Sequence, residues 1–352
     1  MLMRCGKGHG SGAGECSIAS PAAGGNRGGT GNGERGTVGS RAVPVPRFFA
    51  LLAALVLAAC KEEGGELPIL KRIPLPEPVS ATATLTTDSA GRVWVGDAGR
   101  LTVLDTLGRV AARIPVAGAP ARVLRMRGSR LYVTRGPRDL AVVDAGTGRI
   151  LAERRARRAG PVVIDPMARW AFTTGRWGGV LGMDTLLVTR WGWPEAGSEA
   201  GALAISPLGD RVYLAVNGDD DRSPAVQVRD AYSGRVLSSW EPPAPVRGLE
   251  AASDGRLYGW DDDGVFALRH VAGGLAEVWR VSPGLERIEA LRVSPSGARV
   301  AVLARGEGGG VRVLDTADGR VVAREGEAPP DAAWDVRGRL LVLGTREVRV
   351  VR

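Results

Sequence analysis

Residues that carry enzyme chemistry are scarce in this sequence. Its 352 residues include three cysteines and two histidines, and only one of these five residues, His270, lies beyond residue 60. No CxxC, HExxH, GxSxG or P-loop motif occurs beyond residue 60, so nucleophilic, zinc-dependent and P-loop catalysis have no visible support. Without further thiols, no disulfide framework is expected. No apolar run approaches the roughly 20 residues of a membrane-spanning helix.

Glycine and proline are abundant instead. The 51 glycines and 22 prolines interrupt the chain too often for long helices, while valine, leucine and alanine supply ample core. This composition favours β structure. The formal charge of +9 would ordinarily suggest a nucleic-acid partner. However, residues 1–60 hold six basic and two acidic residues, which leaves 41 minus 36, or +5, for the rest. We therefore expect no nucleic-acid partner.

The N-terminal 60 residues have the layout of an export signal. Residues 1–40 contain 13 glycines and no apolar run, so we expect them to be disordered, with the true translation start downstream at Val38, Val43 or Val45. Twelve apolar residues, 48–59, then follow Arg41 and Arg47. A helix of this length spans about 18 Å, too short for a bilayer core of about 30 Å. Residues 41–59 therefore predict a signal peptide.

The end of this apolar run predicts a lipid anchor. Leu57, Ala58, Ala59 and Cys60 resemble the bacterial lipobox, in which the cysteine becomes the acylated first residue of the mature protein. The alternative is a buried helix that ends in a free cysteine. The resemblance implies that residues 60–65 form a lipidated tether. Because the residue after Cys60 is Lys61 and not aspartate, the expected location is the bacterial cell envelope, at the periplasmic face of the outer membrane.

The rest of the chain is a series of repeats. One phrase, a turn followed by arginine and an apolar strand, recurs seven times at intervals of 38 to 45 residues. Its aligned arginines are Arg92, Arg130, Arg169, Arg211, Arg256, Arg299 and Arg339. A second phrase, an apolar strand that runs into a turn residue, follows the first six times. This turn residue is Asp105, Asp144, Asp184, Asp230, His270 or Asp315. Aspartate followed by glycine is hairpin chemistry, so we interpret these residues as structural and not catalytic.

Each unit of about forty residues thus holds four short strands, which is the period of a β-propeller blade. The seventh unit ends one strand short. Residues 69–76, ILKRIPLP, match residues 110–117, VAARIPVA, which form the fourth strand of the first unit. We therefore predict an all-β, seven-bladed propeller of four-stranded blades over residues 66–352. The N-terminal strand completes the last blade and closes the ring.

The repeats resemble two bacterial propeller families. SPLGDRVYLAVNG followed by VRDAYSGRVLSSW is similar to the YVTN-type repeat, and GRLYGWDDDGVFALRHVAGGLAEVW is similar to the PQQ-like repeat. The Gly-His and Trp-Asp signatures of WD repeats are absent. The resemblance implies a fold and an envelope location more securely than an activity, because propellers host enzymes, scaffolds and sensors alike.

Two acidic clusters and three tryptophans are expected on one rim of the propeller, because the loops that carry them lie on the same face. Such a rim suits a protein partner, or Ca²⁺ through its carboxylate oxygens. The alternative is solvated turns with tryptophans packed between blades. The rim consists of Trp177, Trp193, Asp219, Asp220, Asp221, Trp260, Asp261, Asp262 and Asp263.

Glu250 is the candidate for the central channel. Counted three residues back from the turn, the innermost strands offer Val162, Leu203, Leu291 and Ala332 where the fifth blade has Glu250. Residues 153–158, ERRARR, are interpreted as a solvated outer strand that runs into a loop, with contact to anionic lipid as the alternative.

The sequence thus predicts a lipid-anchored, monomeric propeller that binds or scaffolds another envelope protein, with no cofactor expected beyond a possible Ca²⁺. The alternative is a propeller enzyme, either a metal-dependent hydrolase of lactonase type that uses Glu250 or a quinone-dependent dehydrogenase. No cluster of residues suited to hold a quinone supports the dehydrogenase.

Overall fold

The computed structural model describes residues 64–116, 121–135, 139–155, 162–167, 169–174, 179–193, 200–218, 223–305 and 308–352. These residues belong to one compact unit, Lys61–Arg352, and the chain before it forms a separate unit, Met1–Cys60. The predicted disordered segment, signal peptide and lipobox with Cys60 lie outside the described residues, as do Trp177, Asp219, Asp220 and Asp221. Within the described ranges, no helix has the length and apolar character needed to cross a membrane.

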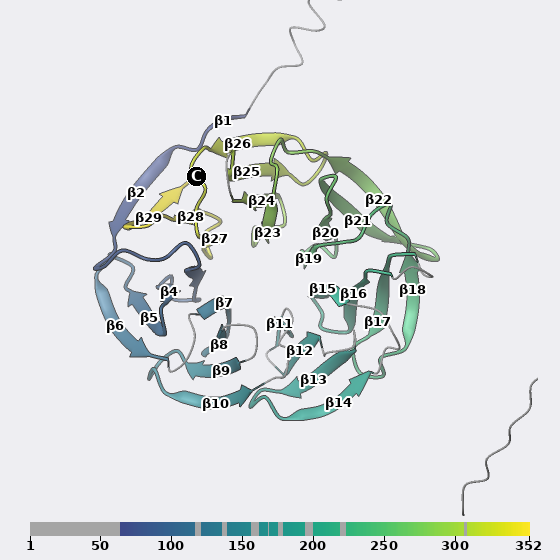
Figure 1. Cartoon of the computed structure of the whole chain (residues 1–352), viewed down its shortest axis with the longest axis horizontal. Helices are drawn as coiled ribbons and strands as arrows, with labels where there is room; N and C mark the ends of the chain where they lie inside the picture. Colours follow the sequence, from purple (N-terminus) through teal and green to yellow (C-terminus); the bar gives the residue numbers. More distant parts are fainter. Residues whose placement is uncertain are drawn as a thin grey trace, which may run out of the picture. The chain divides into compact units, whose positions relative to one another are not determined.

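All regular structure in the described residues is β, and it forms seven four-stranded antiparallel blades around a ring (Figure 1). Blade 1 holds β3 (Thr84–Thr87), β4 (Val93–Asp97), β5 (Arg100–Leu104) and β6 (Val110–Pro115). Blade 2 holds β7 (Ala121–Arg127), β8 (Arg130–Arg135), β9 (Asp139–Asp144) and β10 (Ile150–Arg155). Blade 3 holds β11 (Val162–Ile164), β12 (Trp170–Thr174), β13 (Val180–Asp184) and β14 (Thr189–Trp193). Blade 4 holds β15 (Ala200–Ile205), β16 (Arg211–Val216), β17 (Ala225–Asp230) and β18 (Val236–Trp240).

The remaining three blades follow the same plan. Blade 5 holds β19 (Gly248–Ala251), β20 (Leu257–Trp260), β21 (Val265–Val271) and β22 (Gly274–Val281). Blade 6 holds β23 (Ile288–Val293), β24 (Arg299–Ala304), β25 (Gly310–Asp315) and β26 (Val321–Glu325). Blade 7 holds β27 (Asp331–Trp334), β28 (Leu340–Leu343), β29 (Glu347–Val351) and β2 (Ile69–Pro74). The predicted fold class, seven blades of four strands, is therefore confirmed.

The ring closes as the sequence predicts. β2 from the start of the unit pairs antiparallel with β29 at its end, from Ile69 opposite Val351 to Pro74 opposite Glu347. The innermost strands then contact one another in order around the ring, and β27 of blade 7 contacts β3 of blade 1. Because the last blade shares strands from both ends of the chain, the ring leaves no incomplete blade.

One strand was not predicted. β1 (Gly65–Glu66) pairs in parallel with β26 and adds a fifth strand to the outer edge of blade 6. The backbones approach so closely that a Cβ at Gly64 would lie 2.7 Å from the Ala323 nitrogen. The Leu67 amide donates to the Arg324 carbonyl at 3.0 Å, and the Leu67 side chain is buried. The chain is therefore fastened to blade 6 before it enters blade 7.

Aspartate side chains fix the turns of the blades. In the turn between β3 and β4, Asp88 accepts hydrogen bonds from the Arg92 backbone and side chain and from Trp94, and Gly91 takes a φ of 78°. In the turn between β5 and β6, Asp105 accepts bonds from two backbone amides at 2.8 and 2.9 Å. The same arrangement recurs at Asp144, Asp184 and Asp230. The predicted aspartates thus stabilise the hairpin turns in which they lie.

The hydrophobic core lies between blades. Each pair of neighbouring blades shares a cluster of buried side chains; Trp94 of blade 1, for example, packs with Leu131 and Val133 of blade 2. The closing interface is formed in the same way, with Leu85 of blade 1 against Leu343 of blade 7. Strands that are apolar on both faces are explained by this packing, because each blade is covered by a neighbour on either side.

Candidate functional site

A cavity of about 420 Å³ occupies the centre of the ring and is lined by the innermost strands. Glu250 on β19 contributes to its wall. Strand pairing corrects the predicted register: Glu250 lies opposite Tyr258, which places it level with Arg125 opposite Tyr132 and Arg292 opposite Ala301. The predicted equivalents Val162, Leu203, Leu291 and Ala332 are one position away and buried. In blade 5 the turn begins at Ala252, whose amide donates to the Arg256 carbonyl, one residue before the Ser253 from which the sequence was counted, and this offset shifted the register.

The true equivalents of Glu250 bring several charges together in the channel. The layer comprises Thr86, Arg125, Val163, Ala204, Glu250, Arg292 and Ala333. Three of the seven positions are ionisable, on blades 2, 5 and 6, and all three line the cavity. The channel is therefore a mixed-charge site and not a lone carboxylate.

Asp331 on β27 organises this layer. One carboxylate oxygen accepts from Arg292 Nη2 at 2.8 Å and from the Ala332 amide at 2.9 Å, and the other accepts from the buried Leu85 amide at 3.0 Å. Asp331 thus links blades 6, 7 and 1. Arg292 also donates to the carbonyls of Leu291 and Ala332, so its guanidinium is held by fixed partners.

Arg125 faces this network from blade 2. Burial and the nearby positive charge of Arg292 lower the pKa of Arg125 from its usual range, while Glu250 and Asp331 act in the opposite direction. Over the whole cavity, arginines outnumber carboxylates: Arg125, Arg127, Arg247, Arg292 and Arg305 face Glu250, Glu289 and Asp331. The cavity thus has an excess of positive charge in a partly desolvated setting.

A second hollow, of about 490 Å³, adjoins the mouth of the channel between blades 5 and 6. Arg247, Trp260 and Glu289 line both hollows. Trp260, at the end of β20, is half-buried; its Nε1 donates to the Ile288 carbonyl at 3.2 Å. Its ring packs on Gly248, where a Cβ would lie 1.7 Å from it. The indole is therefore held in one orientation at the boundary of the two hollows.

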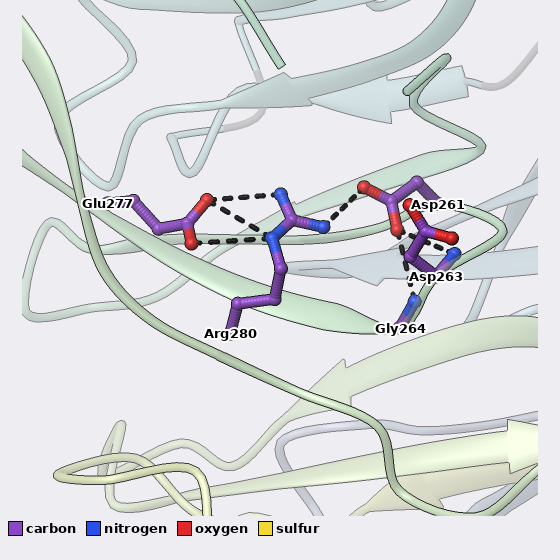
Figure 2. A network of polar contacts seen from close by, with 5 residues as sticks. All are labelled: Asp261, Asp263, Gly264, Glu277 and Arg280. Atoms are coloured by element: carbon purple, nitrogen blue, oxygen red, sulfur yellow. Dashed lines mark hydrogen bonds and ion pairs between the residues drawn. The ribbon is translucent and has the colours of Figure 1, made fainter. Parts of the chain in front are cut away.

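Asp261, in the acidic cluster beside Trp260, is held by Arg280 and by amides of its own loop (Figure 2). Asp261 is buried and accepts from Arg280 Nη1 at 2.6 Å, while Glu277 binds the same guanidinium. The other Asp261 oxygen accepts from the amides of Asp263 and Gly264, both at 3.0 Å. Its carboxylate thus stabilises its own loop instead of facing a ligand.

The other two aspartates of this cluster lie apart from Asp261. Asp262 is exposed and pairs with Arg247 at 2.9 Å; the hydrogen bond from Arg247 lowers the Asp262 pKa. Asp263 is exposed. Within the described residues, no group of three or more side chains is arranged to hold a metal ion. A Ca²⁺ site at Asp261, Asp262 and Asp263 therefore lacks geometric support.

Trp193 lies away from the rim. It is the last residue of the outermost strand β14, and not part of an interblade loop as its sequence position suggested. It is buried, stacks on Trp191 with ring centroids 4.9 Å apart, and packs on Gly234 of blade 4. Its environment is that of a residue packed between blades, which was the structural alternative.

His270 lies within β21 and not in a turn, because this hairpin extends to Val271 opposite Gly274. Its Nε2 lies 2.8 Å from the Tyr213 hydroxyl, across the interface with blade 4. Burial and the Arg211 charge lower the His270 pKa. The residue belongs to interblade packing and is remote from the channel.

Together, the strand order, the closed ring and the charged central cavity define a seven-bladed β-propeller of WD40-like architecture. Known structures agree. The β-propeller domain of Cps50 (Swd1) from Myceliophteria thermophila has a TM-score of 0.68 and 13% identity, over 81% of this chain and 99% of that chain.

Two further structures show the same likeness. A chain in the mitotic checkpoint complex gives a TM-score of 0.67 at 14% identity, over 91% of this chain and 98% of that chain. A chain of Kuenenia stuttgartiensis hydrazine synthase gives 0.62 at 16% identity, over 83% and 98%. No family model and no curated protein matches the chain. At these identities the likeness establishes the fold alone, which is consistent with a protein-interaction scaffold.

Proposed function

We propose that this protein is an envelope-anchored lipoprotein whose propeller binds another envelope protein. The observation that carries the proposal is the placement of Trp260 between two adjoining hollows, bordered by the exposed side chains of Arg247, Asp262 and Arg287. A fixed aromatic ring with arginine neighbours in a concave surface is typical of an interface hot spot.

The binding surface lies on one face of the ring. We call this the loop face, formed by the connections between second and third strands and between blades. The loop from Asp261 to Gly264 and the interblade segment from Ser282 to Arg287 both belong to it. Because arginines outnumber carboxylates in the central cavity, we expect the partner to present an acidic segment to the channel mouth.

The anchor would be the acylated Cys60. Only residues 61–64 separate it from β1, so the thioether would lie within about 18 Å of Gly65 even with the chain fully extended. Several acyl chains would hold such a protein firmly on a membrane. Lys61 at the second position of the mature chain favours the periplasmic face of the outer membrane.

Cross-linking in the native host tests the partner. The tagged full-length protein is cross-linked in cells, purified, and compared with the double variant R247E/R287E. We expect one stoichiometric envelope protein with the natural sequence and at least a tenfold loss of it with the double variant. The matched control is R113E/R190E, which changes two likewise exposed and ion-paired arginines on the outermost strands β6 and β14, away from Trp260 and its two hollows, and should leave recovery unchanged.

Two results would count against the proposal. Recovery of no protein above background in all three samples would rule out the scaffold function. Equal recovery of the partner with R247E/R287E and with the natural sequence would show that the interface does not include the hollows beside Trp260. Cys60→Ala serves separately as the unanchored variant, and we expect it to reduce recovery by moving the propeller away from a membrane-bound partner.

A further inference from the structure

Exposed large apolar side chains are gathered at one end of the blades. We call this end the hairpin face; it carries the turns between first and second strands and between third and fourth strands, together with the first residues of the outermost strands. Apart from Val278 within β22, all exposed large apolar residues in the described part of the chain belong to it. Those in the turns are Leu107, Met167, Leu186, Leu208, Tyr232 and Val336. Val271 is the last residue of β21, next to a turn. The others lie at the start of the outermost strands or directly before one, namely Ile69, Leu70, Val110, Ile150, Leu151, Val188, Val236 and Leu237.

The turns of blades 3 and 4 form the densest part of this surface. Met167 and Leu208 are the apolar tips of two Pro-containing turns and are 70% and 76% exposed. The turns adjoin, because a Cβ at Gly209 would meet the carboxylate of Asp165. Tyr232 lies beside Arg169 at the same junction. Exposed apolar tips on adjoining turns, unlike single scattered ones, are a feature of contact sites.

The surface also carries positive charge. Exposed arginines follow or lie within turns of the hairpin face, namely Arg109, Arg149, Arg235, Arg299 and Arg337. Many aspartates of these turns direct their carboxylates at backbone amides or at a neighbouring arginine. Apolar tips between guanidinium groups suit the headgroup layer of a membrane that contains anionic lipid, where phosphates meet the upper acyl chains.

The direction of β1 indicates that the membrane, and not another protein, covers the hairpin face. β1 runs parallel to β26, so the start of β1 faces the start of β26. β26 starts at Val321, directly after the turn of residues 315–320. That turn belongs to the hairpin face. The chain from Cys60 therefore reaches the propeller at the hairpin end of blade 6. Five residues span at most about 18 Å, so residue 60 lies within that distance of Gly65. We propose that the hairpin face rests on the bilayer surface and that the loop face is turned away from it. This proposal rests on the lipid anchor proposed above.

Site-specific fluorescence tests this orientation. The acylated protein is purified from host membranes as Leu208→Cys and, as the matched control on the loop face, Arg287→Cys. Leu208 is 76% exposed and the Arg287 side chain 78%. Each variant carries an environment-sensitive dye and is incorporated into vesicles of phosphatidylethanolamine and phosphatidylglycerol, with or without nitroxide-labelled lipid. We expect a blue shift and at least twofold nitroxide quenching of the dye at position 208, and neither change at position 287.

A second variant separates docking from anchoring. With the dye at Val336→Cys, the changes M167D and L208D should abolish its blue shift, although the acylated protein still floats with the vesicles. Mass spectrometry of the peptide that begins at Cys60 reports acylation independently. An unacylated chain would overturn both the anchor and the docking proposal. An acylated, vesicle-bound chain whose dyes at 208 and 287 behave alike would overturn the docking alone and would favour a protein cover for the hairpin face.

Discussion

The two faces of the propeller are built from the same repeats but differ in what they expose. On the loop face, the described connections vary in length, line the hollow that adjoins the mouth of the channel, and present mainly charged side chains around Trp260. On the hairpin face, the turns are short and similar, and their tips carry apolar side chains such as Met167 and Leu208. On the hairpin face, side-chain hydrogen bonds to the backbone fix the conformation of each short turn, so the residue at the tip is the one whose identity can change most easily. On the loop face, connections of different length can instead shape a cavity.

The comparison extends to how each end of the blades is stabilised. Near the channel, Asp331 joins three blades through bonds to a guanidinium and two amides. On the hairpin face, each aspartate acts within one turn; Asp88, for example, binds groups of residues 90 to 94. Substitutions near the channel should therefore affect the closure of the ring, whereas those in a turn should have local effects.

The largest stability effect is expected at Asp331. Asp331→Ala would leave Arg292 without its buried carboxylate and the Leu85 amide without an acceptor. Removal of one partner of a buried ion pair costs about 3–5 kcal/mol, so the free energy of unfolding should fall by that amount in urea denaturation. Asp331→Asn retains an acceptor for the Leu85 amide and should cost less. Equal losses for the two variants would show that the charge of Asp331, and not its amide bonds, links the blades.

An intermediate effect is expected at Asp88. Its side chain is buried and accepts from Arg92 Nε at 2.6 Å and Trp94 Nε1 at 3.1 Å. Asp88→Ala would leave the buried Trp94 N–H unsatisfied, which costs about 1–3 kcal/mol. Calorimetry should show a lower melting temperature without loss of two-state unfolding. An unchanged melting temperature would mean that water replaces the carboxylate.

The same turn predicts a pH dependence. Burial raises the Asp88 pKa, but the hydrogen bonds from Trp94 and Arg92 outweigh it, so that the pKa lies below its usual value of about 3.8. A carboxyl group with a lowered pKa in the folded state contributes stability above its unfolded pKa and loses it as the pH falls through the folded pKa. The stability difference between the natural protein and Asp88→Asn should therefore shrink below about pH 4. A difference that stays constant down to pH 2 would contradict the lowered pKa.

The fold could be predicted because its signals repeat. Turn, arginine and strand recur seven times, and the missing last strand of blade 7 matched ILKRIP at the start of the repeats. The short β1 was not predictable, since its two residues pair through backbone groups and carry no periodic pattern.

The candidate site was only partly predictable. Glu250 is visible as a charged exception in an apolar innermost strand and Trp260 as one of three tryptophans expected on the rim, and both line the cavity. Arg125, Arg292 and Asp331 were missed because their equivalence to Glu250, or their proximity to it, depends on turn lengths that differ between blades. Three arginines within one innermost strand, residues 121–127, ARVLRMR, were the available signal.

The smallest stability effect is expected on the loop face itself, at Asp262. Its ion pair with Arg247 is exposed on both sides, 54% for Arg247 and 65% for Asp262, and exposed pairs contribute about 0–1 kcal/mol. Asp262→Asn should therefore leave the unfolding midpoint almost unchanged. The same substitution releases Arg247 at the boundary of the two hollows and adds one net positive charge there. If an acidic partner binds at this face, Asp262→Asn should strengthen its capture in the cross-linking experiment, most clearly at low salt. Weaker capture at unchanged stability would show instead that the partner requires the carboxylate of Asp262. In that case the binding surface is the exposed acidic rim and not the arginine-rich mouth of the channel.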